Sequence, residues 1–394
     1  MDALLFQFMG DNWISIVIFF FFWIMFFFFY PRLMLSQIMW KLEKTAAELE
    51  TLSDRSKTFL TREINKKPSK SLNESMSRFF EFFMIQPVSL DTYGIVKKLD
   101  HVITQEKKRF GYFVDQIAPS MDREKKAAMQ MGLAGGITVH QIAKIVRHYV
   151  ELIRKEKSYQ MAMIIQMQLP MVERMAKAMY KGTESMAKAN PIGDGLGPFA
   201  VSHLIANKRP KEIEEDVVMV KSRMNGRVLF LVRSDGPGGR IGYPGKAVEK
   251  LVNKNRIAKI ITIDAAAKLE GEKTGTVAEG VGVAMGGPGV ERSYIEAVAV
   301  DKNIPLDSII VKMSQEEAIM PMRKAIKDAI PKVKESLERS IERTKKGDNI
   351  IVVGVGNSSG VGHGEKEIRK LEKWVEKHEK QLQAKKKRRG LKKR

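Results

Sequence analysis

The feature that most constrains this chain is an uncharged apolar segment that runs from Trp13 to Tyr30, with Ser15 as its only small polar residue. As an α-helix these 18 residues would cover about 27 Å, close to the thickness of a membrane's hydrocarbon core. Trp13 and Tyr30 stand at the two ends, where amphipathic rings favour the interface. The segment therefore predicts one membrane-spanning helix, which Leu4 to Met9 could extend.

The charges beside this segment predict its orientation. Asp2 and Asp11 precede it, whereas Arg32, Lys41 and Lys44 follow it. Basic residues accumulate on the cytoplasmic side, so we expect the N-terminus outside and the C-terminal body in the cytoplasm. A cleaved signal peptide is the alternative, but no basic residue precedes the segment and no small-x-small cleavage site follows it. Pro31 is expected to end the helix, and the protein is predicted to be a single-pass cell-membrane protein.

The charge of the whole chain points to polyanionic partners. The 394 residues carry a net charge of +22, and eight of the ten residues from Lys385 to Arg394 are basic. Such a surface attracts RNA, a ribosome or anionic lipid headgroups. We expect the basic tail to be a disordered polycation. The absence of cysteine excludes disulfides, thiolate catalysis and zinc-thiolate sites.

Composition changes along the chain predict five segments. They are an anchor at 1–31, a juxtamembrane helix and linker at 32–71, a helical domain at 72–190, a glycine-rich α/β domain at 191–362, and a helix with a polybasic tail at 363–394. The helical domain is rich in methionine, and Pro87, Pro119, Gly135-Gly136 and Pro170 are expected to punctuate its helices.

The juxtamembrane helix carries a narrow apolar seam with steps of three and four residues. Its positions are Leu35, Ile38, Leu42, Thr45, Leu49, Leu52, Ser56 and Phe59. Two interpretations remain open: a short coiled coil that joins copies of the protein into a homo-oligomer, or packing onto the protein's own body. The last helix repeats the heptad spacing from Ile368 to Leu382.

Short β-branched runs after residue 190 predict strands. They are Val217 to Val220, Val228 to Val232, Ile257 to Ile263, Ile295 to Val300, Ile309 to Val311 and Ile350 to Val355. Helical stretches fall between several of them, as at Gly245 to Asn255 and Glu316 to Lys345. Strands that alternate with helices predict an α/β fold with a largely parallel sheet.

Two glycine loops are candidate anion-binding sites. The first loop follows the run ending at Arg233 and leads into a helix. Its candidate residues are Gly236, Gly238, Gly239 and Lys246. Glycines let backbone amides approach an anion, and a helix N-terminus favours negative charge. The alternative is a structural turn that needs positive φ.

The second loop follows the last predicted strand. Its candidate residues are Gly354, Gly356 and Asn357, and His363 lies a few residues further on. Strand, glycine loop and helix is the arrangement that cradles phosphate at the carboxyl end of a parallel sheet. The glycine spacing misses the dinucleotide-binding fingerprint by one residue, so it gives that function little support.

Two aspartates are the candidates for catalysis or metal binding. Asp194 lies in a glycine-rich loop, and Asp264 ends a predicted strand. A carboxylate at the end of a buried parallel strand faces the crevice where α/β proteins place ligands. Two such groups could hold a divalent metal ion or share a proton for hydrolysis. The alternative is that each caps a helix or closes a turn.

The chain resembles two groups of proteins. The phenylalanine-rich anchor, Asp264-Ala-Ala-Ala-Lys-Leu-Glu-Gly-Glu-Lys-Thr-Gly275 and Val353-Gly-Val-Gly-Asn357 resemble an archaeal family of membrane-anchored proteins that is known only as a domain of unknown function. This resemblance covers the whole chain and implies a location without an activity.

Hydrogenase-maturation endopeptidases and spore germination proteases are similar in three short motifs. Gly354-Val-Gly-Asn357, Gly193-Asp-Gly-Leu-Gly-Pro198 and Ile263-Asp-Ala265 resemble theirs. The resemblance implies a metal or catalytic site at Asp194 and Asp264. The motif order differs, because the Gly-x-Gly-Asn strand comes last here, which requires a circular permutation. His363 and His203 are the candidates for a third ligand.

Two functions are compatible with these features. The sequence favours a membrane-tethered adaptor, whose glycine loops bind an anionic ligand and whose basic tail docks RNA or lipid headgroups. The alternative is a membrane-tethered hydrolase that acts at Asp194 and Asp264 on a peptide or a phosphate-bearing substrate. These two differ in whether the aspartates come together in the fold.

Overall fold

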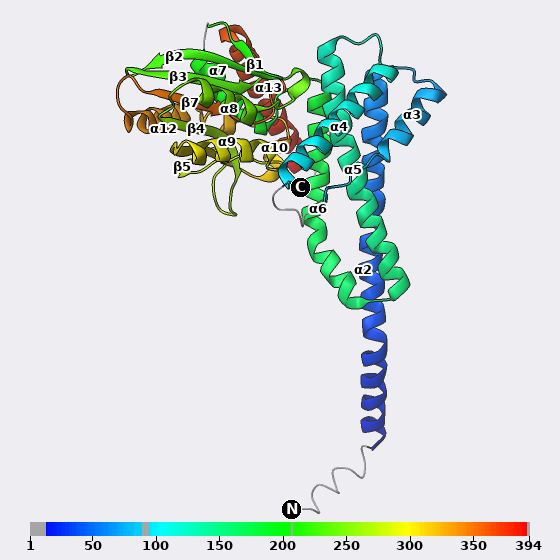
Figure 1. Ribbon diagram of the computed structural model, residues 1–394. Coiled ribbons are helices and arrows are strands. Elements are labelled where there is room, and N and C mark those ends of the chain that lie inside the picture. Colours follow the sequence, from blue (N-terminus) through cyan, green and yellow to red (C-terminus); the bar gives the residue numbers. More distant parts are fainter. Residues whose placement is uncertain (1–12, 89–93, 206–207, 392–394) are drawn as a thin grey trace, which may run out of the picture. The chain divides into compact units, whose positions relative to one another are not determined.

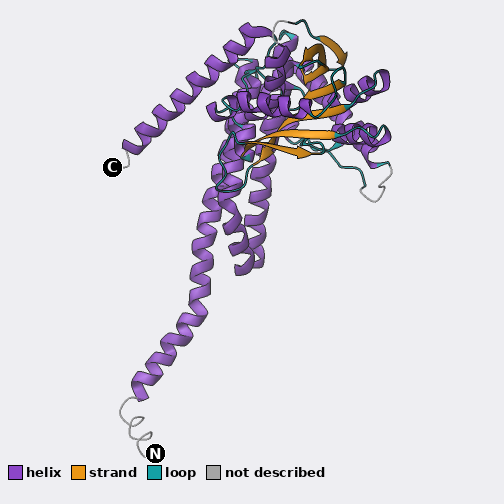
Figure 2. Ribbon diagram, turned by 90° about the vertical axis from the view of Figure 1, so that its left-hand side faces the viewer, coloured by secondary structure: helices purple, strands orange, loops and turns teal. Residues whose placement is uncertain are grey.

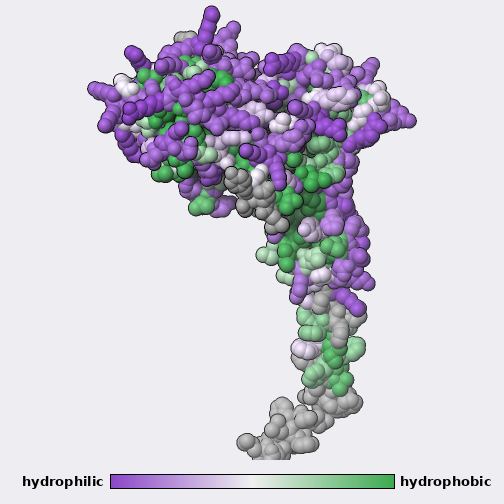
Figure 3. Space-filling view, viewed as in Figure 1, coloured by the Kyte–Doolittle hydropathy of each residue, from purple (hydrophilic) through white to green (hydrophobic). Residues whose placement is uncertain are grey.

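The computed structural model describes residues 13–88, 94–205 and 208–391, and Figure 1 shows their arrangement in helices and strands. The N-terminal half is helical, as predicted. Its helices are α2 (Trp13–Ile64), α3 (Lys70–Phe80), α4 (Ile95–Ile117), α5 (Arg123–Glu156) and α6 (Tyr159–Ala187). Among the described residues, α2 is the one helix that is long and apolar enough to cross a membrane. Figure 3 shows hydrophobic residues along its N-terminal stretch.

Helix α2 does not end at Pro31, so that prediction was wrong. The helix continues through Pro31 to Ile64. A proline removes one backbone hydrogen bond and can bend a helix without ending it. Leu4 to Met9, Asp2 and Asp11, which entered the prediction of the span and its orientation, lie outside the described residues.

The chain divides into two compact units that are not contiguous in sequence. One unit comprises the residues up to Ser53 together with His140–Ala176, and the other comprises Asp54–Val139 and the chain from Lys177 onward. Within the first unit, Leu42 and Leu49 of α2 are buried against apolar residues of α5 and α6. Thr45 donates a hydrogen bond to Glu173 over 3.1 Å. This part of the apolar seam is therefore packed inside the chain itself.

Two of the four predicted helix interruptions are confirmed, because Pro87 and Pro119 lie between helices, whereas the predictions for Gly135-Gly136 and Pro170 were wrong. Gly135 and Gly136 lie within α5, and Pro170 lies within α6. A Cβ at position 136 would lie 2.8 Å from Leu60 and 3.0 Å from Phe80. Here the missing side chain allows neighbouring elements of the second unit to approach closely, and that contact offsets glycine's low helix propensity.

The C-terminal half contains one seven-stranded sheet with the order β1-β2-β3-β7-β4-β6-β5. Its strands are β1 (Lys211–Glu214), β2 (Val217–Met224), β3 (Arg227–Ser234), β4 (Lys259–Ala267), β5 (Val277–Val281), β6 (Leu306–Met313) and β7 (Asn349–Gly354). Strands β3, β7, β4 and β6 are parallel, whereas β1, β2 and β5 pair antiparallel at the edges. This confirms the predicted α/β class with a largely parallel sheet.

Helices cover both faces of this sheet, as Figures 1 and 2 show. Alternate residues of the central strands point to opposite faces and form two apolar clusters. One cluster packs against α7 (Leu196–Ile205), α12 (Ile330–Glu342) and α13 (Gly364–Leu391), and the other against α8 (Pro244–Lys254) and α9 (Val290–Asp301). Shorter elements complete this half: η1 (Gly193–Gly195), η2 (Pro237–Gly239), α10 (Gln315–Ile319) and α11 (Lys324–Lys327).

One predicted strand is a helix. The run from Ile295 to Val300 lies within α9. Its buried residues are Ile295, Val298 and Ala299, which have helical spacing, whereas Val300 is 81% exposed. A short apolar run does not distinguish a strand from a buried helical segment.

The basic tail also differs from its prediction. Helix α13 continues past Lys385 to Leu391, and residues 392–394 lie outside the described residues. Lysine and arginine have good helix propensity, and basic residues are favourable near a helix C-terminus. The described part of the tail is therefore helical and not disordered.

Candidate functional site

The parallel strands β4 and β7 bring the first candidate residue to the carboxyl edge of the sheet. Ile263 of β4 pairs with Gly354, the last residue of β7, and Asp264 follows. Asp264 does not end its strand, as the sequence suggested, because β4 continues to Ala267 beside β6. Its carboxylate accepts a hydrogen bond from the Ala265 amide over 2.6 Å. Asp264 is therefore a buried strand residue and not a helix cap.

Asp194 lies at the same carboxyl edge of the sheet, although it comes from a different part of the chain. It lies in the short turn η1, immediately before α7. The Gly193 amide donates to the Met320 carbonyl over 3.0 Å, which fixes the turn. The Asp194 carboxylate accepts a hydrogen bond over 2.9 Å from the backbone amide of Asn357, in the loop after β7. This bond ties η1 to the end of β7.

Glycines allow η1 and α7 to approach the strand ends this closely. A Cβ at Gly197 would lie 2.0 Å from the Val355 carbonyl oxygen and 2.5 Å from that of Ile263. A Cβ at Gly354 would lie 2.3 Å from the Gly197 carbonyl oxygen. Gly356 has φ +127°, and its Cβ would lie 2.0 Å from the Asp194 carbonyl oxygen. The space that a side chain would occupy at Gly354 and Gly356 is therefore filled by the protein's own backbone.

Burial raises the pKa of both carboxyl groups. Burial contributes most to raising the pKa of Asp264 well above its usual value, and the nearby charge of Asp194 raises it further. The amides of Ala265 and Gly286 oppose this shift. The pKa of Asp194 is also raised by burial, against the opposing hydrogen bond from Asn357. A buried carboxyl group that also faces a second negative charge favours its protonated form.

Among the described residues, the two aspartates are not joined by a third acidic or histidine side chain into a metal-binding group. Across residues 13–88, 94–205 and 208–391, no group of three or more such side chains could hold a metal ion. His363 interacts through Nε2 with Asp235 over 2.7 Å and through Nδ1 with Arg233 over 2.9 Å. His203 lies 3.7 Å from Glu372. The two histidines that the sequence offered thus contact other residues.

The glycines of the loop after β3 are packed against the protein. Gly238 has φ +66°, and a Cβ there would lie 2.2 Å from the backbone between Ala127 and Ala128. A Cβ at Gly239 would lie 2.5 Å from the Asn357 side chain. Gly236 is similarly close to Arg240. These glycines permit a tight turn, which was the structural alternative for this loop.

The start of α8 holds groups of the protein itself. Lys246 forms an ion pair with Asp100 of α4 over 3.0 Å. The Gly245 amide donates to the Glu291 carboxylate over 2.7 Å. Burial raises the pKa of Glu291, and this amide opposes the shift. The positive N-terminal end of α8 therefore already faces a carboxyl group of the protein. An anion-binding site at Gly236, Gly238, Gly239 and Lys246 stays a prediction.

Sequence reasoning missed a buried arginine at this edge. Arg233, at the carboxyl end of β3, is completely buried. Its guanidinium donates to Asp235 and lies beside His363. Burial lowers the arginine's pKa, and the charge of Asp235 opposes that shift. The sequence did contain a signal for it, because Arg233 is a charged residue that directly follows the apolar run of a predicted strand.

These features define an α/β protein with an acidic candidate site at the carboxyl edge of a parallel sheet. The chain belongs to the DUF1512 family, because two family profiles together match most of it. "Protein of unknown function (DUF1512) N-terminal domain" matches residues 16–189, and "Domain of unknown function (DUF1512) C-terminal" matches residues 192–362. No curated protein and no solved structure shows a significant match to the chain. The resemblance to the two protease groups rests on its motifs alone.

Proposed function

We propose that this protein is a membrane-tethered hydrolase whose reaction centre is the pair Asp194 and Asp264. The observation that carries the proposal is geometric: Asp194 is hydrogen-bonded to the loop after β7, and Asp264 lies on the neighbouring strand β4 at the same carboxyl edge of the sheet. Burial raises the pKa of both carboxyl groups. Pairs of acidic groups whose environments favour a shared proton serve as acid and base in hydrolysis.

The two environments suggest different roles. Asp264 has the more strongly raised pKa and is 3% exposed, so it is the group that keeps the proton. Asp194 is partly exposed and acts as the base. Asp194 takes a proton from water as the water oxygen bonds to a carbonyl carbon. Asp264 then gives its proton to the leaving nitrogen as the carbon–nitrogen bond breaks, and the pair again holds one proton.

The charge of the site favours a peptide over a phosphate-bearing substrate. No lysine or arginine contributes to the pKa shift of either aspartate. A phosphate would meet two carboxyl groups without a compensating cation, whereas an amide carbonyl is neutral. A divalent ion would supply that cation, but only the two carboxylates are available as acidic ligands among the described residues. Proton sharing is therefore the form of the site that we propose.

The adaptor function is less well supported than the hydrolase. Its glycine loops pack against the protein's own backbone, and Lys246 is paired with Asp100. For the acid pair, by contrast, no lysine or arginine of the described residues affects the pKa of either carboxyl group. Helix α2 would tether the hydrolase to the membrane, with the sheet on the cytoplasmic side, as the basic residues after Tyr30 predict.

The experiment uses the full-length protein and a library of blocked peptides, with cleavage products identified by mass spectrometry. We expect cleavage by the wild type and a loss of about 10²-fold or more in Asp194→Asn and Asp264→Asn. Asp301→Asn is the matched control, because Asp301 is exposed on α9. Cleavage that persists in both site variants, or none in the wild type, would refute the proposal. Activity that requires added Mn²⁺ would replace proton sharing by metal-assisted hydrolysis.

A further inference from the structure

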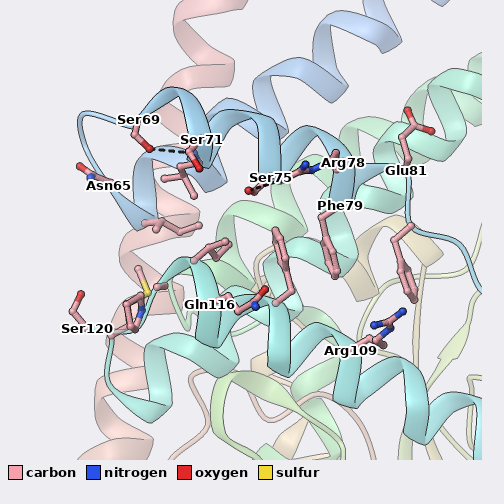
Figure 4. A pocket seen from close by; sticks show the side chains of 18 of the residues that line it. Asn65, Ser69, Ser71, Ser75, Arg78, Phe79, Glu81, Arg109, Gln116 and Ser120 are labelled. Carbon is pink, nitrogen blue, oxygen red and sulfur yellow. Dashed lines mark hydrogen bonds between the residues drawn. The ribbon is translucent and has the colours of Figure 1, made fainter.

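A large surface groove lies far along the chain from the aspartates. It is an open groove of about 1010 Å³ between α3 and α4. Figure 4 shows Ser69, Ser71 and Ser75 along the α3 side and Gln116 on the α4 side. Binding sites for small molecules have volumes of about 300–1,000 Å³, so the groove is large enough for one.

Aromatic rings form the apolar lining of this α3–α4 groove. Phe79 of α3 stacks on Phe113 of α4, with ring centroids 3.8 Å apart. Phe79 also lies against Phe82, with centroids 5.6 Å apart. Phe83, which lines the groove too, is 69% exposed. Phe83 therefore adds an exposed ring to the aromatic part of the lining.

The charges of the groove are gathered at one end. Its lining contains three charged residues, Arg78, Glu81 and Arg109, and Figure 4 shows all three toward the end of the groove away from Ser69, Ser71 and Ser120, with Arg78 beside Ser75. Arg78 has a weak contact with Ser75 at 3.4 Å. Arg109 has no hydrogen bond or ion pair with any described residue. That end therefore has one excess positive charge and an arginine available to an anion.

We propose that the α3–α4 groove binds an anionic amphiphile, with its acyl chain on the aromatic lining and its carboxylate or phosphate at Arg78 and Arg109. A ligand with one charged end and a long apolar body matches a groove with one charged end and uncharged walls. An acidic amphipathic helix carries charges along its length, and the serines and glutamine of the walls would leave those charges unpaired. The ligand is either a free fatty acid or a phosphate-bearing lipid.

The test uses full-length protein in phosphatidylcholine nanodiscs and a palmitate that carries a photoreactive diazirine. After illumination, peptide mapping locates the labelled residues. We expect saturable labelling of the segments 72–83 and 109–121, which unlabelled palmitate or lysophosphatidate suppresses and hexadecanol does not. Stronger suppression by lysophosphatidate identifies a phospholipid source, and stronger suppression by palmitate identifies a free fatty acid.

Two kinds of variant separate binding from folding. The double variant Arg78→Gln/Arg109→Gln should lose about ten-fold in labelling, because it loses two charge-assisted contacts. Lys108→Gln is its matched control, since this exposed neighbour lies outside the groove. Ser75→Trp should block the groove while circular dichroism shows an unchanged helix content. Labelling confined to α2, equal suppression by hexadecanol, or binding of an acidic amphipathic peptide in place of palmitate would overturn the proposal.

Discussion

The backbone amide of Asn357 donates a hydrogen bond to the carboxylate of Asp194 over 2.9 Å, across 163 positions of the chain. The bond holds Asp194 at the end of β7, whose neighbour β4 carries Asp264. Because the donor is a backbone amide, the contact depends on the path of the loop and persists if the side chain of Asn357 is changed.

The first prediction concerns stability and pH. A carboxyl group whose pKa is raised by folding binds its proton more tightly in the folded protein. Its contribution to stability is therefore complete below the unfolded pKa of about 3.9 and is lost as pH rises through the folded pKa. Asn cannot ionise, so the Asp264→Asn variant does not lose stability as the pH rises. We expect the variant to be more stable than wild type at pH 7, by about 1.4 kcal/mol for each pKa unit of the shift.

Unfolding of the detergent-solubilised protein, followed by circular dichroism between pH 4 and pH 8, measures this difference. The difference in the free energy of unfolding between Asp264→Asn and wild type should become smaller toward acidic pH. Asp301→Asn should follow wild type throughout, since Asp301 is exposed. A pH-independent difference would mean that Asp264 carries no raised pKa.

The second prediction concerns the crossing of α7 over the strand ends. Gly197→Ala would place a Cβ 2.0 Å from the Val355 carbonyl oxygen, and Val355 is held to β4 by a hydrogen bond of 2.9 Å from its amide to the Ile263 carbonyl. We expect a loss of about 4 kcal/mol or more in the free energy of unfolding, or no folded protein. Gly280→Ala is the control, because nothing lies within 4 Å of its Cβ. Its effect should stay within about 0.5 kcal/mol. Equal stability of the two variants would show that the close approach is not required.

The strand pattern predicted the parallel sheet, and parallel strands place their carboxyl ends on one edge. The position of Asp264 at the carboxyl edge of the sheet was therefore predictable. The position of Asp194 depends on the tertiary path of η1, and no local pattern specifies that path. The same limit applies to Lys246, because its partner Asp100 lies 146 positions away. Side-chain pairing over such separations is decided by packing, whereas helix and strand type are largely decided by local periodicity.

The third prediction addresses the apolar seam of α2. Leu42 is completely buried in the core of the first unit. Leu42→Ala should therefore lower the free energy of unfolding by about 2–5 kcal/mol and leave the oligomeric state unchanged. Leu33→Ala is the control, because Leu33 is 62% exposed on the same helix. If light scattering instead shows that Leu42→Ala changes the number of copies in the particle, the seam joins copies of the chain.

The fourth prediction concerns the membrane anchor. Removal of residues 1–31 deletes the apolar part of α2 and leaves the buried seam residues from Leu35 onward. We expect the truncated protein to move from the membrane to the soluble fraction at moderate salt, while its circular dichroism still shows a folded body. Replacement of residues 1–31 by an unrelated membrane-spanning helix should restore membrane association. Retention of the truncated protein after a high-salt wash would reveal a second membrane-binding element.

The fifth prediction concerns the polybasic end of α13. Removal of Lys385 to Arg394 should weaken binding to RNA or to anionic liposomes, and the lost affinity should fall steeply with salt, because binding of a polycation to phosphates releases counterions. A variant with glutamine at the eight basic positions keeps the length and should behave like the truncation. The ligand whose binding changes more identifies the partner as nucleic acid or membrane. An unchanged salt dependence with both ligands would show that the tail binds neither, since eight positive charges cannot leave a phosphate surface without altering that slope.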